Sequence, residues 1–464
     1  MPDQKQELLR ALPSVTELLK SPVAVGWLRR QPQPLVTDCL RRALEQVRQR
    51  ILSGVEAGQL AEAVLVLAEQ HLTEAAEPHV RMAINATGII LHTGLGRAVL
   101  PAGVIDSLSA EFKGYCTLAV DRETGERAER DELIEYILTE LTGAEAATVV
   151  NNNAAATMLV LAALAASREV IVSRGQLIEI GGSFRLPEVM AQSGARLVEV
   201  GATNRTHLKD YQKAITDQTS AILRAHPSNY RVVGFTSEVP LRELGELCRQ
   251  RNILLIDDLG AGALVDLKPF DLPHEPTVRE SIEAGADVVL FSGDKLIGAG
   301  QCGIVVGKQA LVAKLRQHPL MRAVRVDKTC LMVLERTLHL FRDPSRLARE
   351  HPTYRMLATS LDDLKARADK LAELIAAVTP TVKTEVRSSQ SYLGSGSLPT
   401  EAIASFELLV SVPGRSASEL ARRLRLDEAC IFGRIQEDRV RLDVRTLTDE
   451  QLPQIAAALG RIAK

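Results

Sequence analysis

A lysine that follows a buried apolar run is the residue of this chain best placed for covalent chemistry. The run Val288 to Phe291 is followed by Ser292, Gly293 and Asp294, and then by Lys295. A lysine amine forms an imine with a carbonyl compound, and desolvation beside another cation lowers its pKa and makes it a usable nucleophile. The alternative is a solvated loop lysine. Asp294 either steers proton transfer or caps a turn.

Two other apolar runs end in groups that suit related chemistry. Asp257 follows Leu254 to Ile256, where a carboxylate is able to hydrogen-bond and protonate a heterocyclic nitrogen, although carboxylates often end strands. Asn152-Asn153-Ala154 follows a second run and opens an alanine-rich helix. The free backbone amides and the dipole of such a helix suit a phosphate, while the simpler interpretation is N-capping by asparagine.

Together these features are the protein parts that a pyridoxal phosphate (PLP) enzyme needs. Lys295 would hold the cofactor covalently, and Asp257 would face its ring nitrogen. Asn152, Asn153 and Ala154 would receive its phosphate, with a further hydroxyl from Ser292. The cofactor supplies the electron sink and the protein supplies orientation. The sequence therefore predicts PLP as the cofactor.

The apolar runs that position these residues alternate with helical stretches between about residues 85 and 341. We expect strands at 146–150, 169–173, 196–200, 220–225, 253–256, 288–291 and 303–306. This alternation predicts a mostly parallel sheet covered by helices, an α/β domain of the aminotransferase-like PLP fold type I. In such sheets ligands bind beyond the carboxyl ends of the strands, which is where the predicted site residues lie.

Three domains are expected along the chain. Residues 1–79 form a small helical domain, 80–343 the large PLP-binding domain, and 344–464 a connecting helix with a small α+β domain. The connecting helix is expected to run to Val378, and the Ser- and Gly-rich segment 388–399 to be an exposed loop. The segment Arg29 to Arg50 carries six arginines against two acidic residues, which suits phosphates or forms an ordinary solvated helix face.

Composition narrows the class of protein. The 464 residues carry 56 basic and 58 acidic side chains, so no global field favours nucleic acid, and an anionic partner must meet a local patch. The six cysteines include no Cys-x-x-Cys pair, so they predict neither a zinc site nor a disulfide framework. His92 and His226 have no second ligand at zinc-like spacing, so we expect them to be cofactor neighbours or core residues, and we expect no metal site. The N-terminus lacks a signal pattern and the longest apolar run, 154–166, is too short to span a bilayer, so a cytoplasmic protein is expected.

Four motifs make the expectation more specific. They are MAINATGIILHTGLGRA at 82–98, SRGQLIEIGGSF at 173–184, GATNRT at 201–206 and SGDK at 292–295. Together they resemble the bacterial L-seryl-tRNA(Sec) selenium transferases, also called selenocysteine synthases. The resemblance covers essentially the whole chain, including the helical N-terminal region, which binds tRNA in that family. One departure is Gly94, where the family pattern has asparagine.

The resemblance implies conversion of L-seryl-tRNA(Sec) to L-selenocysteinyl-tRNA(Sec). The seryl amine would displace Lys295 from its aldimine with PLP, and the freed lysine would remove the α-proton. Loss of the β-hydroxyl would give a dehydroalanyl-tRNA intermediate, to which selenium from selenophosphate adds. Arg97, Arg322 and Arg325 match anion-binding arginines of the family, and guanidinium groups offer paired donors to tetrahedral oxyanions. The alternative for Arg322 and Arg325 is ordinary surface arginine.

The resemblance also implies a homodecamer built of five dimers, with seryl-tRNA(Sec) and selenophosphate as partners and with neither DNA nor a membrane. Two other functions stay open. A PLP-dependent lyase or racemase that acts on a free amino acid shares the lysine and the phosphate loop, but has no need of the N-terminal helical region. A non-catalytic tRNA-binding scaffold would have no need of an intact Lys295 and Asp257.

Overall fold

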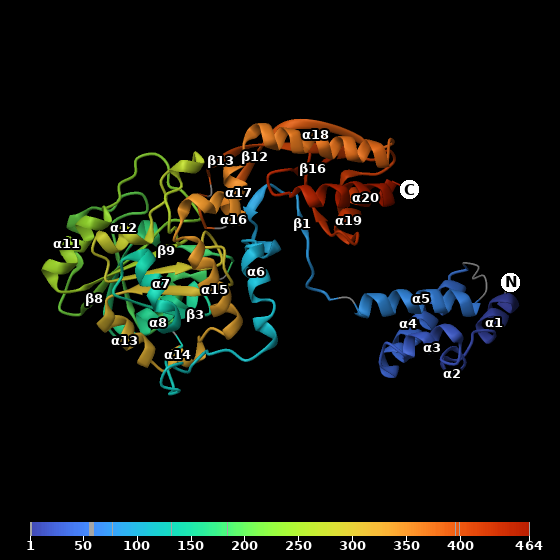
Figure 1. Ribbon diagram of the computed structural model, residues 1–464, viewed down its shortest axis with the longest axis horizontal. Helices are drawn as coiled ribbons and strands as arrows, with labels where there is room; N and C mark the ends of the chain where they lie inside the picture. Colours follow the sequence, from blue (N-terminus) through green and yellow to red (C-terminus); the bar gives the residue numbers. More distant parts are fainter. Residues whose placement is uncertain are drawn as a thin grey trace. The chain divides into compact units, whose positions relative to one another are not determined.

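The computed structural model describes residues 2–54, 60–76, 78–130, 132–182, 184–394, 396–398 and 400–463. The chain divides into two compact units, Met1–Met82 and Ala83–Lys464, each of which is described by itself (Figure 1). The expected domain boundaries at 79/80 and 343/344 stay predictions. In the described part of the chain, no helix combines the length and the apolar character needed to cross a bilayer.

The first unit is a bundle of helices, as the sequence predicted. Its helices are α1 (Pro2–Arg10), α2 (Val15–Leu18), α3 (Pro22–Leu28), α4 (Gln33–Leu52) and α5 (Leu60–Ala76). Helix α3 begins where the Ser21 side chain accepts a hydrogen bond from the Ala24 amide at 3.2 Å. In α4 the buried residues recur every three or four positions, so one face packs against α5 and the other carries the arginines into solvent.

A seven-stranded sheet is the centre of the second unit. Its strand order is β3-β11-β10-β9-β8-β4-β7, and all neighbours are parallel except β11, which is antiparallel to β3 and β10. The strands are β3 (Ala146–Val150), β4 (Glu169–Ser173), β7 (Arg196–Val200), β8 (Thr219–Ala225), β9 (Leu254–Gly260), β10 (Val288–Ser292) and β11 (Gly303–Gly307). Each strand coincides with a predicted run, so the expected mostly parallel α/β fold is confirmed.

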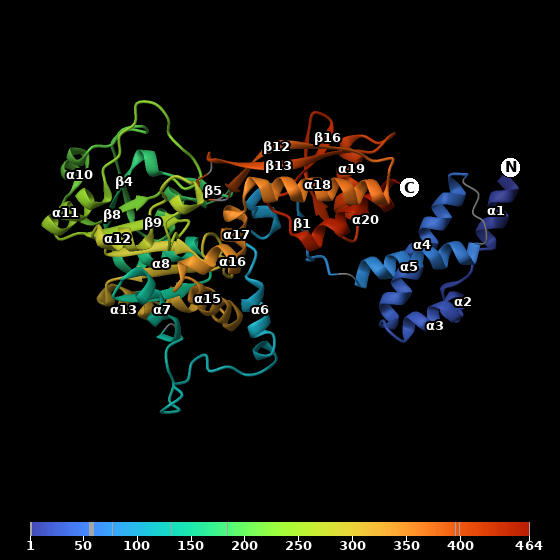
Figure 2. The ribbon, with the colours of Figure 1, turned by 45° about the horizontal axis from the view of Figure 1, so that its top comes forward.

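Helices cover both faces of this sheet (Figure 2). One face packs on α8 (Asn153–Ala165), α9 (Leu186–Gln192) and α13 (Gln309–Gln317). The other face packs on α7 (Glu132–Thr142), α11 (Leu241–Arg251), α12 (Val278–Glu283) and α15 (Lys328–Leu340). Successive residues of a strand point to opposite faces, so Leu255 belongs to the second core and Ile256 to the first. This alternation decides below which carboxylate faces the lysine.

The remaining elements connect the large sheet to its neighbours in the chain. The helices are α6 (Ala102–Leu108), α10 (Leu208–Ala214) and α14 (Leu320–Ala323). The short strands β5 (Glu179–Ile180) and β6 (Phe184–Arg185) pair with each other, and β1 (Ile84–Asn85) pairs with β14 (Ile431–Phe432) in parallel. The strand β1 thus ties the start of the second unit to its C-terminal part.

The C-terminal part is built on a five-stranded sheet of order β15-β16-β13-β12-β2. Its strands are β2 (Ile89–Leu91), β12 (Lys383–Gly394), β13 (Ala402–Ser411), β15 (Arg434–Gln436) and β16 (Arg439–Asp443). The helices α18 (Leu361–Val378), α19 (Ala417–Leu426) and α20 (Leu452–Ala463) pack on it. An α+β arrangement was expected here, and the strands and helices near 405–412, 418–424, 440–444 and 450–462 were predicted correctly.

Two expectations for this region are wrong. The connecting segment is not one helix, because α16 (Leu347–Glu350), α17 (Pro352–Ala358) and α18 are separate, with breaks at His351 before a proline and at Ser360, the N-cap of α18. The segment 388–394 is not a loop but the end of β12, which pairs with β13 as far as Tyr392 and with β2 at Tyr392 and Gly394. Ser388 is exposed, whereas Ser389 and Ser391 point inward, toward Asp443, and Ser391 is fully buried.

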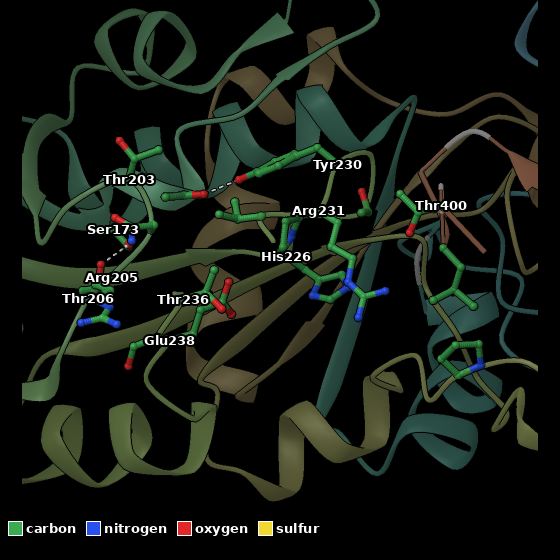
Figure 3. A pocket seen from close by; sticks show the side chains of 18 of the residues that line it. Ser173, Thr203, Arg205, Thr206, His226, Tyr230, Arg231, Thr236, Glu238 and Thr400 are labelled. Carbon is green, nitrogen blue, oxygen red and sulfur yellow. Dashed lines mark hydrogen bonds between the residues drawn. The ribbon is translucent and has the colours of Figure 1, made fainter. Parts of the chain in front are cut away.

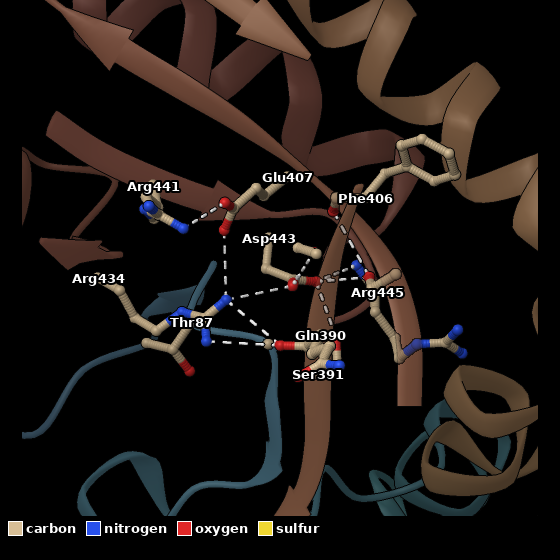
Figure 4. A network of polar contacts seen from close by, with 12 residues as sticks. Thr87, Gln390, Ser391, Phe406, Glu407, Arg434, Arg441, Asp443 and Arg445 are labelled. Atoms are coloured by element: carbon tan, nitrogen blue, oxygen red, sulfur yellow. Dashed lines mark hydrogen bonds and ion pairs between the residues drawn. The ribbon is translucent and has the colours of Figure 1, made fainter. Parts of the chain in front are cut away.

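Those serines belong to a polar network in the five-stranded sheet (Figure 4). The buried Asp443 carboxylate accepts hydrogen bonds from Ser391 and Ser405, at 3.0 and 2.9 Å, and lies 3.5 Å from the Arg434 guanidinium. Gly88, with φ of 73°, approaches this carboxylate so closely that a Cβ would lie 2.6 Å from its carbon. Any larger residue at position 88 would therefore displace Asp443 from its partners.

Candidate active site

Lys295 lies in a turn just beyond the carboxyl end of β10. Its side chain is buried, with 6% of the residue exposed, and it lines a cavity of about 240 Å³. The same cavity is lined by Arg97, by Ser292 and by the first residues of α8. The structure thus brings together the predicted lysine, the predicted serine and the predicted phosphate-binding helix at one edge of the sheet.

The electrostatic environment of Lys295 favours a neutral amine. Burial lowers the pKa of Lys295, and the nearby Arg97 guanidinium lowers it further, while Asp258, Asp294 and Glu275 act in the opposite direction. Arg97 is itself held by an ion pair, with 2.6 Å between its Nη1 and Oδ2 of Asp294. A desolvated lysine beside a cation is the arrangement that makes an amine nucleophilic near neutral pH.

The N-terminus of α8 opens into the cavity. The Asn152 side chain caps this helix by accepting a hydrogen bond from the Ala155 amide at 2.8 Å. Capping by Asn152 therefore occurs, and it leaves the two earlier amides of the helix, those of Asn153 and Ala154, at the cavity wall. The start of α8 packs closely against Gly303 on β11, and only glycine allows this contact, because a Cβ there would collide with the Asn152 carbonyl.

The predicted ring carboxylate, Asp257, does not line the cavity. It points to the face covered by α12, where it accepts hydrogen bonds from Arg224 at 2.9 Å and from Ser281 at 2.7 Å. The next residue, Asp258, points to the face covered by α8 and lines the cavity with Lys295. The prediction that Asp257 faces the cofactor is therefore wrong by one residue, and Asp258 takes that position. The reason is that successive side chains along β9 point to opposite faces of the sheet.

Asp258 is buried, and hydrogen bonds from α8 hold its carboxylate in place. Its two carboxylate oxygens accept hydrogen bonds from Asn153 at 2.8 Å and from Thr157 at 3.2 Å, both on α8. Burial raises the pKa of Asp258, while the hydrogen bond from Asn153 and the charge of Lys295 lower it. Asn153 therefore connects the phosphate-binding helix to this carboxylate, a role that the sequence analysis missed.

The loop after β8 contributes two further residues, His226, which was expected to be a cofactor neighbour or a core residue, and Ser228, which the sequence analysis did not place in the site. The Ser228 hydroxyl is buried at the cavity wall and has no hydrogen-bond partner among the described residues. His226 also lines the cavity, its backbone amide donates to the Asp258 carbonyl at 2.8 Å, and its Nε2 lies 3.3 Å from Glu275. The rule that ligands bind beyond strand ends would have pointed to Ser228 as well, because β8 ends at Ala225.

Arg322 and Arg325 are not brought into the cavity. Both side chains are exposed, Arg322 on α14 and Arg325 just after it. Their backbone nevertheless lies beside the end of β3, since the Asn151 amide donates to the Val324 carbonyl at 2.8 Å and Val150 forms a bridge with Arg325. Of the three predicted arginines, only Arg97 lines the cavity that contains Lys295.

The residues present fit PLP. The cavity offers a desolvated lysine, a carboxylate, the free amides of a helix and the unpartnered Ser228 hydroxyl, which are the groups that the cofactor requires. Gly396 keeps the space around the lysine open, because a Cβ there would lie 2.6 Å from Nζ of Lys295. Within the described ranges, no group of three or more His, Cys, Asp or Glu side chains could hold a metal ion.

A solved structure shares this architecture. D-glucosaminate-6-phosphate ammonia-lyase superposes with a TM-score of 0.57 at 20% sequence identity, over 83% of this chain and 96% of that one. The fold is that of the aminotransferase-like PLP-dependent enzymes.

Sequence comparison identifies the family within that class. The model of the L-seryl-tRNA selenium transferase family matches residues 83–448, and that of the selenocysteine synthase N-terminal region matches 9–48. An L-seryl-tRNA(Sec) selenium transferase from Methylocella silvestris is 48% identical over 446 residues, 95% of each chain. One from Geotalea daltonii is 45% identical over 98% of this chain and 99% of its own length. The chain belongs to the L-seryl-tRNA(Sec) selenium transferase family, and its cofactor is PLP.

Proposed function

We propose that this protein converts L-seryl-tRNA(Sec) to L-selenocysteinyl-tRNA(Sec) with selenophosphate as the selenium donor. Its membership of the family supports the activity, and the burial of Lys295 beside Arg97 in a cavity lined by Asp258 is the observation that carries it. In the net reaction the bond between Cβ and oxygen of the seryl group breaks and a bond between Cβ and selenium forms. The donor's phosphorus exchanges selenium for oxygen, so phosphate is released and no oxidant is needed.

Each part of the cofactor has a residue to hold it. We propose that Lys295 attaches PLP covalently, that Asp258 faces its ring nitrogen, and that the amides of Asn153 and Ala154 with the Ser292 hydroxyl receive its phosphate. When bound, PLP withdraws electrons from the α-carbon of the amino acid attached to it. The buried Asp258 carboxylate and the N-terminus of α8 are held in place by Asn153, so the two ends of the site are fixed relative to each other.

Lys295 also acts as the proton carrier in this proposal. Burial and the Arg97 guanidinium lower the pKa of Lys295, so a Lys295 amine that is not attached to the cofactor would accept the α-proton of the seryl group. Asp294 is buried and forms an ion pair with Arg97. We therefore propose that Asp294 positions the Arg97 guanidinium beside Lys295. Arg97 in the cavity, with Arg322 and Arg325 from the exposed segment beside β3, would bind the anionic donor.

Membership of the family supports a proposal for the larger partners. We propose that the helical unit binds the tRNA through the exposed arginines between Arg29 and Arg50, and that residues 80–343 and 344–464 form the PLP-binding and the small domain. A homodecamer of five dimers and a cytoplasmic location, where charged tRNA is found, complete the proposal. Neither DNA nor a membrane is expected as a partner.

The visible absorption spectrum of the purified protein tests this function. A band from PLP on Lys295 should be present, should shift when seryl-tRNA(Sec) is added, and should not shift with free L-serine. A shift with free serine alone would favour a lyase or racemase that acts on a small amino acid. Absence of the band would contradict the proposal that the protein is a PLP-dependent enzyme. The Lys295→Ala variant is the control, because it keeps the cavity and loses the attachment point.

A further inference from the structure

A second cavity lies beside the lysine cavity in the same unit (Figure 3). It has a volume of about 320 Å³ and is formed by the loops that follow β4, β7 and β8, with Thr400 and Glu401 from the segment after β12. Figure 3 shows Tyr230, Arg231 and His226 around one space, with Arg205 and Thr206 on another side of it. All these loops leave the carboxyl ends of strands, as the loops of the lysine cavity do.

The two cavities share part of their wall. His226 and Ser228 line both of them. A substrate with one end in the lysine cavity would therefore reach the second cavity past these two residues. In an aminoacylated tRNA the amino acid is esterified to the ribose of the 3′-terminal adenosine, so this nucleoside lies one ester bond from the reacting serine.

The charges of the second cavity suit a neutral ligand better than an anion. Its two arginines, Arg205 and Arg231, are outnumbered by Glu238, Glu275 and Glu401. Arg231 is moreover ion-paired with Glu401 at 2.9 Å. Selenophosphate would meet little net attraction here. A nucleoside carries no charge and presents hydrogen-bonding edges, which the hydroxyls, amides and carboxylates of this wall are able to satisfy.

A flat, exposed surface lies at the rim of this cavity. The Phe235 ring is 84% exposed, and the Arg205 guanidinium lies 5.8 Å from its centroid. The Phe235 carbonyl accepts hydrogen bonds from Asn204 at 2.6 Å and from Arg205 at 3.1 Å, so two residues of the cavity wall fix this part of the loop. An aromatic ring and a guanidinium plane held in this way are the surfaces on which single-stranded nucleobases stack.

We propose that this second cavity is the subsite for the 3′-terminal adenosine of the aminoacylated tRNA. The ribose lies next to His226 and Ser228, and the base extends toward Arg205 and Phe235 at the rim. The inference rests on the proposed function, since it assumes that the substrate is a charged tRNA. It assigns to Phe235 and Arg205 the recognition of the end of the tRNA, separately from the arginines of the helical unit.

A small analogue of the tRNA end tests the subsite without the rest of the tRNA. The probe is 3′-amino-3′-deoxyadenosine that carries serine through an amide bond, which cannot be hydrolysed like the ester. Its affinity is measured by titration calorimetry for the PLP-loaded wild type, for Phe235→Ala and for Val233→Ala. Val233 is equally exposed on the same loop, and neither residue lines the cavity itself. Val233 has no aromatic ring on which a base could stack, whereas the Phe235 ring lies beside the Arg205 guanidinium, so Val233→Ala is the matched control.

The expected result is that the wild type and Val233→Ala bind the analogue alike, while Phe235→Ala binds it roughly 10- to 100-fold more weakly, as loss of one stacked base predicts. With full-length seryl-tRNA(Sec), Phe235→Ala should raise KM and leave kcat nearly unchanged. Unchanged affinity of Phe235→Ala for the analogue would overturn the proposal. A change in its mass by light scattering would also overturn it, because the loop would then contact a second copy. Failure of the wild type to turn over seryl-tRNA(Sec) would instead remove the proposed function.

Discussion

The ion pair between Arg97 and Asp294 places one fixed charge of each sign beside Lys295. Nη1 of Arg97 lies 2.6 Å from Oδ2 of Asp294, and the two residues are 197 positions apart in the chain. Their effects on the lysine are opposite, because Arg97 lowers the pKa of Lys295 and Asp294 raises it. A single substitution in this pair should therefore either raise or lower the pKa of Lys295, depending on which partner is replaced.

Substitutions in this pair should move the pH at which Lys295 reacts with PLP. The apoprotein amine must be neutral to attack the aldehyde, so the rate of PLP attachment should rise as the pH passes the pKa of Lys295. Arg97→Gln removes a cation and should shift this rise to higher pH, whereas Asp294→Asn removes an anion and should shift it to lower pH. Stopped-flow absorbance against pH measures both. Shifts in the same direction, or none, would contradict the electrostatic account.

The neighbouring carboxylates on β9 should have separable roles. Asp258→Asn should keep the fold and reduce kcat by roughly 100-fold, because the ring of PLP loses its charged partner. Asp257→Asn should instead leave the spectrum of the folded protein unchanged and destabilise it by about 3–5 kcal/mol, because it breaks the buried pair with Arg224. Urea unfolding and the visible spectrum of both variants distinguish these outcomes. The reverse assignment would be indicated if Asp257→Asn altered the spectrum.

This pair of residues also marks how far the sequence could be read. Strands such as β3 and β10 were predictable because each is an apolar run buried on both faces, and Lys295, Ser292 and Asn152 lie just beyond strand ends, as predicted. Whether Asp257 or Asp258 faces the lysine depends on which helices cover which face, and the spacing of neighbouring residues does not reveal that. The contribution of residue 396, a hundred positions beyond the lysine, came only from the tertiary fold.

Buried His351 should make the stability of the second unit depend on pH. Burial lowers its pKa to about 4, and its Nε2 lies 2.8 Å from the Ile297 carbonyl. His351 of the unfolded chain binds a proton near pH 6.5, whereas in the folded chain it stays neutral until the pH approaches 4. The contribution of His351 to the free energy of unfolding is therefore fully present above pH 6.5 and is lost as the pH falls toward 4. The loss amounts to roughly 3 kcal/mol over this window.

The variant His351→Gln keeps a donor for the Ile297 carbonyl and has no titrating group at this position. Between pH 7 and pH 4.5 its urea midpoint should fall less than that of the wild type. Parallel decreases in the two proteins would show that other groups, and not His351, account for the acid sensitivity.

The helical unit should bind tRNA in a salt-dependent way. Arg42 and Arg48 are ion-paired on their own helix, with Asp38 and Glu45, both at 2.7 Å. Replacing Arg29, Arg30 and Arg41 together by glutamine should therefore weaken tRNA binding more than replacing Arg42 and Arg48. The slope of log affinity against log salt should fall by about 0.7 to 0.9 for each lost phosphate contact. Equal slopes for the two variants and the wild type would place the tRNA contacts elsewhere.

Transfer of selenium to the tRNA tests the central claim most directly. Radiolabelled selenophosphate and seryl-tRNA(Sec) are incubated with the PLP-loaded wild type or with Lys295→Ala, and label in the aminoacyl group of the tRNA is counted. The wild type should form selenocysteinyl-tRNA(Sec), and Lys295→Ala should be slower by about 1,000-fold or more while remaining folded and able to bind tRNA. Absence of transfer by the wild type, or transfer by Lys295→Ala at a comparable rate, would contradict the account.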